Sequence, residues 1–431
     1  MPPKATEALI KYIGVKGTCP LAESRDGVLG RVWDGVPPIQ EVKFMDIKTL
    51  DSEYVAHTYA RFPVAFVRGQ GSILTDDAGR DYIDLGTGIA VNVFGAADPV
   101  WQEAVTKQIA ALPHASNLYY TEPCARLAQL LCERTGMKKV FFGNSGAEAN
   151  ECAIKAARLW AFEHYGEERK TIVTLKNSFH GRTIATLAAT GQDVFHTKFG
   201  PFPQGFVYAD PTDAADVIRL IEETNACAVM MEPVQGEGGV YPLSEDFVKA
   251  VADYAAAHDV LLIFDEVQTG NGRTGELYGY MHYGVTPDIV STAKGIGGGL
   301  PLGACLLGDR VADLYVPGTH GSTFGGNPVA CAGAYSILSR IDDALLAGVK
   351  ERADYIFSAL TGAKGVKSVS GRGLMIGIEC EKSAREVIDG CLARGVVVLS
   401  AKTKVRLLPA LNIPMDQLQA AIAVLKEVIA E

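Results

Sequence analysis

The sequence has few of the features that mark secreted, membrane-spanning or metal-binding chains. Its nine cysteines lie apart, without a C-x-x-C pair, which favours reduced, mostly buried thiols over a disulfide framework or a zinc site. No apolar run approaches about 18 residues, so no transmembrane helix is expected, and the first residues have no signal-peptide core. We therefore expect a cytoplasmic protein without a metal site.

Positive charge is also scarce, because 40 Lys and Arg residues stand against 50 Asp and Glu, a formal net charge of −10. That balance excludes a general nucleic-acid surface and leaves room for a local basic pocket that binds a small anion. The chain has 431 residues, of which 48% are apolar. This length predicts about two or three domains around a large core.

From Lys139 onwards, short apolar runs alternate with helical stretches. This alternation is typical of an α/β fold with a mostly parallel sheet covered by helices. The expected strands are Lys139–Phe142, Thr171–Leu175, Cys227–Met231, Val260–Phe264 and Gly303–Leu307, and the expected helices include Ala147–Leu159 and Phe247–His258. Since ligands bind at the carboxyl ends of such strands, the segments after each strand are where we expect the chemistry.

The remaining segments predict a second, smaller domain that is built from both ends of the chain. We expect an N-terminal arm at 1–50, the first part of the small domain at 51–85, a large domain at 86–330 and the rest of the small domain at 331–431. The last part contains two expected strands and a closing helix: Gly373–Glu379, Gly395–Leu399 and Met415–Ile429.

Two segments after strands have the residues of an anion and ring site. G-N-S-G-A-E-A-N-E starts at Gly143 and leads into a helix, whose free N–H groups suit a phosphate; the alternative is a helix simply capped by Asn144 or Ser145. In K-N-S-F-H-G-R-T, Phe179 can stack on a flat ligand and Arg182 can bind a carboxylate. The alternative there is an ordinary loop with a solvated arginine.

Two further segments suggest a reactive centre. Asp265 ends a buried strand, so its carboxylate must pair with a cation, a donor or a ligand. L-L-I-F-D-E also resembles the acidic strand of NTPases, but the chain contains no G-x-x-x-x-G-K-[ST] loop, and no G-x-G-x-x-G either. Lys294 lies between Ala and Gly, about one strand–helix–strand step beyond Asp265. This crowded setting suits a lysine that forms a Schiff base; the alternative is an ordinary exposed loop lysine.

Together these residues are the groups that a site for pyridoxal phosphate and its substrate needs: an anion site, an aromatic ring that stacks, an acid, an amine and a group that binds a carboxylate. From about Tyr54 to the C-terminus the chain resembles the class III (ω-amino acid) aminotransferases of fold type I. The resemblance rests on F-F-G-N-S-G-A-E-A-N-E, S-F-H-G-R-T, E-P-V-Q-G-E-G-G-V, F-D-E-V-Q-T-G-N-G-R-T-G, P-D-I-V-S-T-A-K-G-I-G-G-G-L-P-L-G and H-G-S-T-F-G-G-N-P.

The resemblance implies roles in cofactor binding. Lys294 is expected to bond covalently to pyridoxal 5'-phosphate and to shuttle the proton, while Asp265 keeps the ring nitrogen protonated. Thr323 is expected to reach the phosphate of a neighbouring subunit, which implies a homodimer with shared sites. The other implied cofactor contacts are Ser145, Gly146, Ala147, Phe179, Glu266, Val267 and Gln268.

The resemblance also implies how two substrates share one pocket. Arg182 is expected to bind the far carboxylate of the amino donor, and Arg406 the α-carboxylate of glutamate, with Glu237 covering Arg406 when the other substrate is bound. Such a movable pair changes the pocket charge without leaving a bare buried cation. Ser322 is expected close to the substrate, and Tyr59 matches a substrate-side tyrosine.

Within the family the resemblance is greatest to the branch of arginine biosynthesis that uses N2-acetylornithine as donor and 2-oxoglutarate as acceptor, from G-I-A-V-N, S-N-L-Y-Y and R-L-L-P-A-L-N-I. The small residue Gly88 leaves room for an N-acyl group. Succinylornithine, succinyl-diaminopimelate, ornithine and 4-aminobutyrate remain alternative donors, and a same-fold aminomutase or a non-enzymatic regulator are alternative functions. The chain departs from the family pattern at G-A-A-D-P, Gly95–Pro99, which leaves the packing of that turn open.

Overall fold

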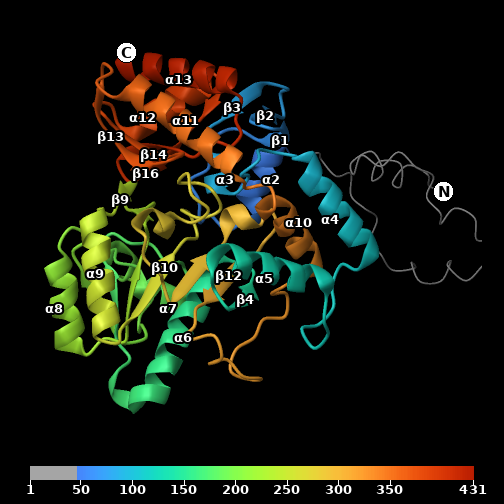
Figure 1. The fold of residues 1–431 in the computed structure, drawn as a ribbon. Coiled ribbons are helices and arrows are strands. Elements are labelled where there is room, and N and C mark those ends of the chain that lie inside the picture. Colours follow the sequence, from blue (N-terminus) through green and yellow to red (C-terminus); the bar gives the residue numbers. More distant parts are fainter. Residues whose placement is uncertain (1–45) are drawn as a thin grey trace, which may run out of the picture. The chain divides into compact units, whose positions relative to one another are not determined.

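The computed structural model of the protein describes residues 46–431 (Figure 1). Contacts divide the chain after Pro63, so residues 46–63 are described by themselves. They contain α2 (Ile47–Tyr54), which begins after Asp46, whose carboxylate accepts hydrogen bonds from two backbone N–H groups of the first turn. We expected an N-terminal arm at residues 1–50. Residues 1–45 of this arm lie outside the described residues, and its last residues, 47–50, belong to α2.

The main sheet has seven strands, and their order across the sheet is β4, β12, β11, β10, β7, β5, β6. Every neighbouring pair is parallel except the two pairs that involve β12. The predicted mostly parallel α/β sheet is therefore confirmed. The strands are β4 (Lys139–Gly143), β5 (Ile172–Leu175), β6 (Phe206–Ala209), β7 (Ala228–Met231), β10 (Leu261–Asp265), β11 (Ile289–Thr292) and β12 (Gly303–Leu307).

The strands β7, β10 and β12 agree with the sequence prediction to within a residue at each end. They are buried along their whole length and, apart from Asp265 at the end of β10, apolar, because helices bury both faces of a parallel sheet. Two strands of the sheet are missing from the expected set: the short central strand β11, and β6, which lies at the edge of the sheet and is mostly half-buried. An edge strand needs no continuous apolar run, so its pattern is weak.

Helices pack along this sheet and supply its core. α6 (Gly146–Tyr165) runs along β4, β12 and β11 with a stripe of buried alanines, which lets the helix approach the strands closely. The helices α8 (Ala214–Thr224) and α9 (Glu245–Ala257) lie side by side and pack on β5, β6 and β10 (Figure 1). The others are α4 (Pro99–Ala111), α5 (Glu122–Thr135), α7 (Ile184–Ala189) and α10 (Pro328–Leu338).

Two four-stranded sheets and one two-stranded sheet accompany the main sheet in residues 64–431. The antiparallel sheet β13–β14–β17–β16 packs with α11 (Asp343–Leu360), α12 (Ala384–Ala393) and α13 (Met415–Ala430). In the other four-stranded sheet, β3 near the N-terminal end pairs with β15 near the C-terminal end. The strands are β1 (Phe66–Gln70), β2 (Ile73–Asp76), β3 (Asp81–Asp84), β13 (Val366–Arg372), β14 (Met375–Cys380), β15 (Val396–Val397), β16 (Leu399–Ala401) and β17 (Lys404–Leu407).

The pairing of β3 with β15 agrees with a small domain made from both chain ends, while the expected domain bounds at 50, 85 and 330 stay a prediction. The unusual turn Gly95–Pro99 is closed by a carboxylate. Asp98 accepts a hydrogen bond from the backbone N–H of Trp101 at the start of α4, and it forms an ion pair of 2.6 Å with Arg340. Within residues 46–431, no helix combines the length and the apolar character that a membrane crossing requires.

Candidate active site

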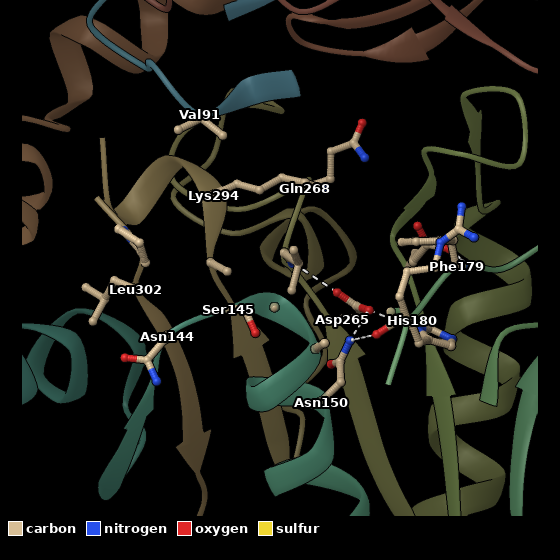
Figure 2. A pocket seen from close by; sticks show the side chains of 18 of the residues that line it. Val91, Asn144, Ser145, Asn150, Phe179, His180, Asp265, Gln268, Lys294 and Leu302 are labelled. Carbon is tan, nitrogen blue, oxygen red and sulfur yellow. Dashed lines mark hydrogen bonds and ion pairs between the residues drawn. The ribbon is translucent and has the colours of Figure 1, made fainter. Parts of the chain in front are cut away.

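A cavity of about 450 Å³ lies where the carboxyl ends of β4, β5, β7, β10 and β11 meet (Figure 2). This is the edge of the sheet at which the sequence predicts the chemistry. An apolar wall is formed by Val91 and by the segment Leu300–Leu302. Nine of the predicted site residues line the cavity: Ser145, Gly146, Ala147, Phe179, Arg182, Asp265, Val267, Gln268 and Lys294.

The start of α6 forms one wall of the cavity. Ser145 caps the helix, because its hydroxyl accepts a hydrogen bond from the backbone N–H of Glu148 at 3.1 Å. The N–H groups of Gly146 and Ala147 begin the helix and therefore have no intrahelical acceptor. A Cβ on Gly146 would lie 2.6 Å from a methyl carbon of Val267, so only glycine fits there. The result is a narrow cradle that suits an anion.

Asp265, the last residue of β10, is held from three elements. Its Oδ2 accepts a hydrogen bond from Asn150 of α6 at 2.7 Å and lies 2.8 Å from Nδ1 of His180, while its Oδ1 accepts from the backbone N–H of Val267 at 3.0 Å. Asn150 also donates to the carbonyl of His180. Figure 2 draws this network below the side chain of Lys294. The carboxylate therefore has one orientation and is shielded from water.

Lys294 follows β11 in a short turn of 3₁₀ helix and extends into the cavity (Figure 2). Its backbone has a positive φ of 47°, a strained conformation for a residue with a side chain. Burial lowers the pKa of its ammonium group below the ordinary value, although the carboxylates of Glu237 and Asp265 oppose that effect. A lysine with a lowered pKa supplies more of the neutral amine, which is the nucleophilic form.

The turn after Lys294 is fixed by close packing. A Cβ on Gly295 would lie 2.7 Å from a methyl carbon of Val93, and the carbonyl of Gly297 accepts a hydrogen bond from the indole N–H of Trp101 at 3.2 Å. These contacts leave no room for the turn to move. They hold Lys294 at one place in the cavity wall.

A charged contact connects the main sheet to β17. Arg406 Nη1 lies 2.5 Å from Glu237 Oε1 and 3.0 Å from Gln268 Oε1, and the amide of Gln268 also donates to Glu237 at 3.3 Å. Glu237 lies between the short strands β8 (Val234–Gln235) and β9 (Tyr241–Pro242). Burial alone would raise the pKa of Glu237, but Arg406 outweighs it and the pKa lies below its usual value.

Arg182 lines the cavity from the segment after β5. Its guanidinium group stacks on the ring of Phe195 at 4.2 Å and on the ring of Phe179 at 5.5 Å. The side chain is exposed, so its donors remain available to a carboxylate. The backbone of Phe179 is fixed by Glu232, which accepts its N–H at 2.9 Å.

Three further predicted residues of the part 64–431 do not line the cavity: Glu266, Ser322 and Thr323. The carboxylate of Glu266 accepts three hydrogen bonds within its own loop, from Thr269, Gly279 and Tyr280, and thus serves that loop. Ser322 contacts Asn144, which lines the cavity, and Thr323 is exposed and does not line the cavity of its own chain. Tyr59 belongs to residues 46–63, so its role stays a prediction.

The lining residues that were not among the predicted site residues include Asn150, His180 and Glu232. Asn150 is a buried amide on the alanine-rich inner stripe of α6, a placement that signals a bonded polar group. His180 has its Nδ1 2.8 Å from Oδ2 of Asp265, a contact between distant segments that the sequence alone does not indicate. Burial raises the pKa of Glu232 to about 7, which the sequence alone does not indicate.

The fold and the site define an enzyme with a buried lysine and a fixed aspartate at the strand ends of an α/β sheet. The chain belongs to the class-III aminotransferases, since the family profile "Aminotransferase class-III" matches residues 54–429. The protein is therefore a transaminase, and the resemblance read from its motifs is confirmed.

Known proteins of this kind are similar over most of the chain. The acetylornithine aminotransferase of Haemophilus ducreyi is 49% identical over 387 residues, 89% of this chain and 98% of that protein. The succinylornithine transaminase of Citrobacter koseri is 44% identical over 85% of this chain and 92% of that protein. A crystallised ornithine aminotransferase of Toxoplasma gondii, described with partial occupancy of PLP at its active site, superposes with a TM-score of 0.85 at 29% identity, covering 90% of this chain and 95% of that chain.

Proposed function

We propose that this aminotransferase moves the terminal amino group of N2-acetylornithine to 2-oxoglutarate, which yields N-acetylglutamate semialdehyde and glutamate. The observation that carries the proposal is the Glu237–Arg406 contact at 2.5 Å beside the cavity. An enzyme with two alternating substrates needs a carboxylate site that can be opened for one and closed for the other. An aminomutase, which has no separate amino acceptor, has no such need.

We infer that the cofactor is pyridoxal 5'-phosphate, because the residues present fit each part of it. The N-terminus of α6 suits the phosphate. The packing of Val267 against Gly146 leaves no room for a side chain at this position. Asp265 suits a ring N–H, and Lys294, with its lowered pKa, suits the aldehyde. When bound, this group supplies an electron sink for the substrate carbon that loses a proton.

The chain's own residues then have separate tasks. Nζ of Lys294 would take the proton from the substrate carbon and deliver it to the cofactor within the same half-reaction, and the second half-reaction would run these transfers in reverse. The three hydrogen-bonding partners of Asp265 keep its carboxylate directed at the ring nitrogen. Phe179 covers the ring face, and Gln268, whose amide lies between the cavity and Arg406, supplies a polar group for the ring oxygen.

Substrate choice follows from the two arginines. In the amino-donor half, Arg182 binds the donor's carboxylate and Glu237 keeps Arg406 neutralised. In the glutamate half, Arg406 binds the α-carboxylate once Glu237 moves away. A Cβ built on Gly88 would meet only Val91, a residue of the cavity wall, at 3.9 Å, and this space beside Val91 supports a donor with an N-acyl group. A succinyl donor is the second candidate, supported by the similarity to the Citrobacter koseri enzyme.

We also propose a homodimer. Large apolar side chains are exposed next to Thr323, the residue expected to reach a second subunit; they are Leu118, Tyr119, Tyr120 and Phe324. An exposed patch of this kind marks a surface that a partner covers. Sedimentation of the holoenzyme at low micromolar concentration is expected to give a dimer or a larger assembly, and a fully active monomer would contradict the shared site.

Initial rates with 2-oxoglutarate and each amino donor at equal concentration test the substrate. We expect the highest kcat/KM with N2-acetylornithine, a lower value with N2-succinylornithine, and much lower values with ornithine and 4-aminobutyrate, which carry no acyl group. Turnover of an amino donor without any oxo-acid would contradict the proposal and favour an aminomutase.

A further inference from the structure

Arg273 is a deeply buried cation of the 266–275 loop. Its side chain heads the largest fully buried side chains and is 1% exposed. It forms no ion pair within residues 46–431, and its Nε and Nη2 have no hydrogen-bonding partner there. Burial lowers the pKa of its guanidinium group to about 9, and Asp84 only partly opposes this. A buried charge with unsatisfied donors lowers the stability of the fold. Its presence therefore suggests that it has a specific task.

The one donor that is used, Nη1, contacts two separate segments. It donates to the carbonyl of Leu374 at 3.2 Å and to the carbonyl of Pro409 at 2.5 Å. Leu374 immediately precedes β14, and Pro409 lies two residues beyond β17, the strand that carries Arg406. The backbone N–H of Leu374 also donates to the carbonyl of Arg273 at 2.9 Å.

Neighbouring contacts show how tightly these segments meet. Gly373 has a positive φ of 55°, and a Cβ there would lie 2.4 Å from the carbonyl carbon of Thr274, so the two backbones touch. On its other side, the segment after β17 is held by Thr87, whose hydroxyl donates to the carbonyl of Leu408 at 2.6 Å. Leu408 and Pro409 are thus bonded from both sides.

We propose that Arg273 is a positioning residue that fixes the segment after β17 against the 266–275 loop and thereby sets the position of Arg406 relative to Gln268 and Lys294. This inference rests on the proposed function, in which Arg406 binds the α-carboxylate of glutamate. The loop carries both Gln268 and Arg273. Gln268 accepts a hydrogen bond from the guanidinium group of Arg406, and Arg273 donates to the backbone carbonyl of Pro409, three residues further on.

The second carboxylate site, at Arg182, does not depend on the hydrogen bonds of Arg273 to Leu374 and Pro409. Arg182 stacks on Phe195 and Phe179, on the segment after β5, and has no contact with Arg273 or with the segment after β17 among the described residues. Loss of the Arg273 contacts must therefore lower kcat/KM for glutamate and 2-oxoglutarate far more than for the acylated donor. A general loss of stability would affect both substrates alike.

The test compares holoenzyme variants in separate half-reactions. Arg273→Met keeps most of the volume and removes the donors, while Arg273→Lys keeps the charge with a single donor atom. The matched control is Arg169→Met, because Arg169 is also buried and donates to two carbonyls, those of Ala226 and His258, but at the opposite end of the strands. Single-turnover kcat/KM is measured for glutamate and for N2-acetylornithine, thermal unfolding for each variant, and the Kd of the unreactive dicarboxylate glutarate by calorimetry.

For Arg273→Met we expect kcat/KM for glutamate to fall about 10²-fold, the scale of a 1 Å misplacement, and glutarate to bind correspondingly more weakly. N2-acetylornithine should stay within about threefold of the unmodified enzyme, and Arg273→Lys should lie in between. Arg169→Met should lower thermal stability without separating the two substrates.

An equal fall for both substrates, or unchanged glutarate binding, overturns the role of Arg273. Should Arg273→Met give no folded protein, the same criteria apply to Arg273→Lys. Arg406→Ala separates the two proposals. If it weakens glutamate while Arg273→Met does not, only the positioning role is wrong. If Arg406→Ala itself leaves glutamate unaffected, the proposed two-substrate function is wrong.

Discussion

Two side-chain contacts that each involve a carboxylate lie at or beside the cavity, and they differ in how far solvent reaches them. In the His180–Asp265 contact the side chains are 0% and 4% exposed, and both residues belong to segments of the main sheet. In the Arg406–Glu237 contact the arginine is 3% exposed and the glutamate 32%, and the arginine comes from the separate sheet that contains β17. The first contact is enclosed, whereas the second is open on the glutamate side.

This difference suits two different tasks. Asp265 has three hydrogen-bonding partners from rigid elements, so moving it would leave several buried donors unsatisfied. Glu237 can leave Arg406 at a smaller cost, because water reaches its carboxylate and a substrate carboxylate can replace it. We therefore expect the Asp265 contact to serve both half-reactions and the Glu237 contact to distinguish them.

Lys294 interacts electrostatically with the carboxylates of both contacts, so its removal should have the largest effect. We expect Lys294→Ala to lose at least about 10⁴-fold in turnover in both half-reactions, because the proton carrier is gone. Borohydride reduction followed by peptide mapping should find the cofactor on Lys294 in the unmodified enzyme. The control is Lys404→Ala, which removes another buried lysine, and cofactor found on any lysine other than Lys294 would contradict the assignment.

Breaking the enclosed contact should come next. Asp265→Asn keeps the shape but removes the charge that we propose would face the ring nitrogen. Removing a preorganised electrostatic contact of this kind costs about 10²–10³-fold. We expect that loss in both half-reactions equally, measured in single turnovers with each donor. Near-normal rates in a folded variant would refute the role of Asp265, and a loss confined to one substrate would refute the comparison drawn above.

Breaking the open contact should affect one half-reaction only. Loss of a buried charged contact costs about 2–5 kcal/mol, or about 30-fold to a few thousandfold in kcat/KM. Arg406→Ala should show this loss with glutamate and much less with N2-acetylornithine, while Arg182→Ala should weaken both. Glu237→Ala should instead let α-carboxylates bind in the wrong half-reaction, which lowers selectivity for the acylated donor. Equal slowing of both donors by Arg406→Ala would argue against the switch.

The smallest expected effect concerns stability near the enclosed contact. Burial raises the pKa of Glu232 from 4.5 to about 7. Between these two values the folded chain keeps a proton that the unfolded chain releases, so the free energy of unfolding falls as pH rises through this window. The contribution is at most about 1.4 kcal/mol per pH unit.

Urea unfolding of the cofactor-free protein at pH 5, 6 and 7 measures this dependence. Glu232→Gln should reduce the slope, even though the variant is less stable overall because one backbone N–H loses its acceptor. Glu266, whose pKa burial also raises to about 7, is present in both proteins and cancels in the difference. An identical slope in the two proteins would mean that Glu232 does not titrate in this range.

The sequence predicted the positions of the strands better than their partners. The bounds of β10 and β12 follow from apolar runs, because a strand buried on both faces must be apolar throughout. That β12 runs antiparallel to both of its neighbours could not be predicted, since strand direction is set by the path of the connecting segments. The pairing of β3 with β15 joins residues more than 300 positions apart, and no local pattern encodes it.

What the sequence determined by itself was the set of groups at the strand ends: an anion cradle, an acid, an amine and a carboxylate binder, and with them the family. The order of strands and helices brings these segments to one edge of the sheet. Only the tertiary structure decided how each group is held: Asn150 and His180 on Asp265, Gln268 on Arg406, and Arg273 on the segment after β17. Hydrogen bonds between distant segments depend on packing to within a few tenths of an ångström, and spacing along the chain carries no such information.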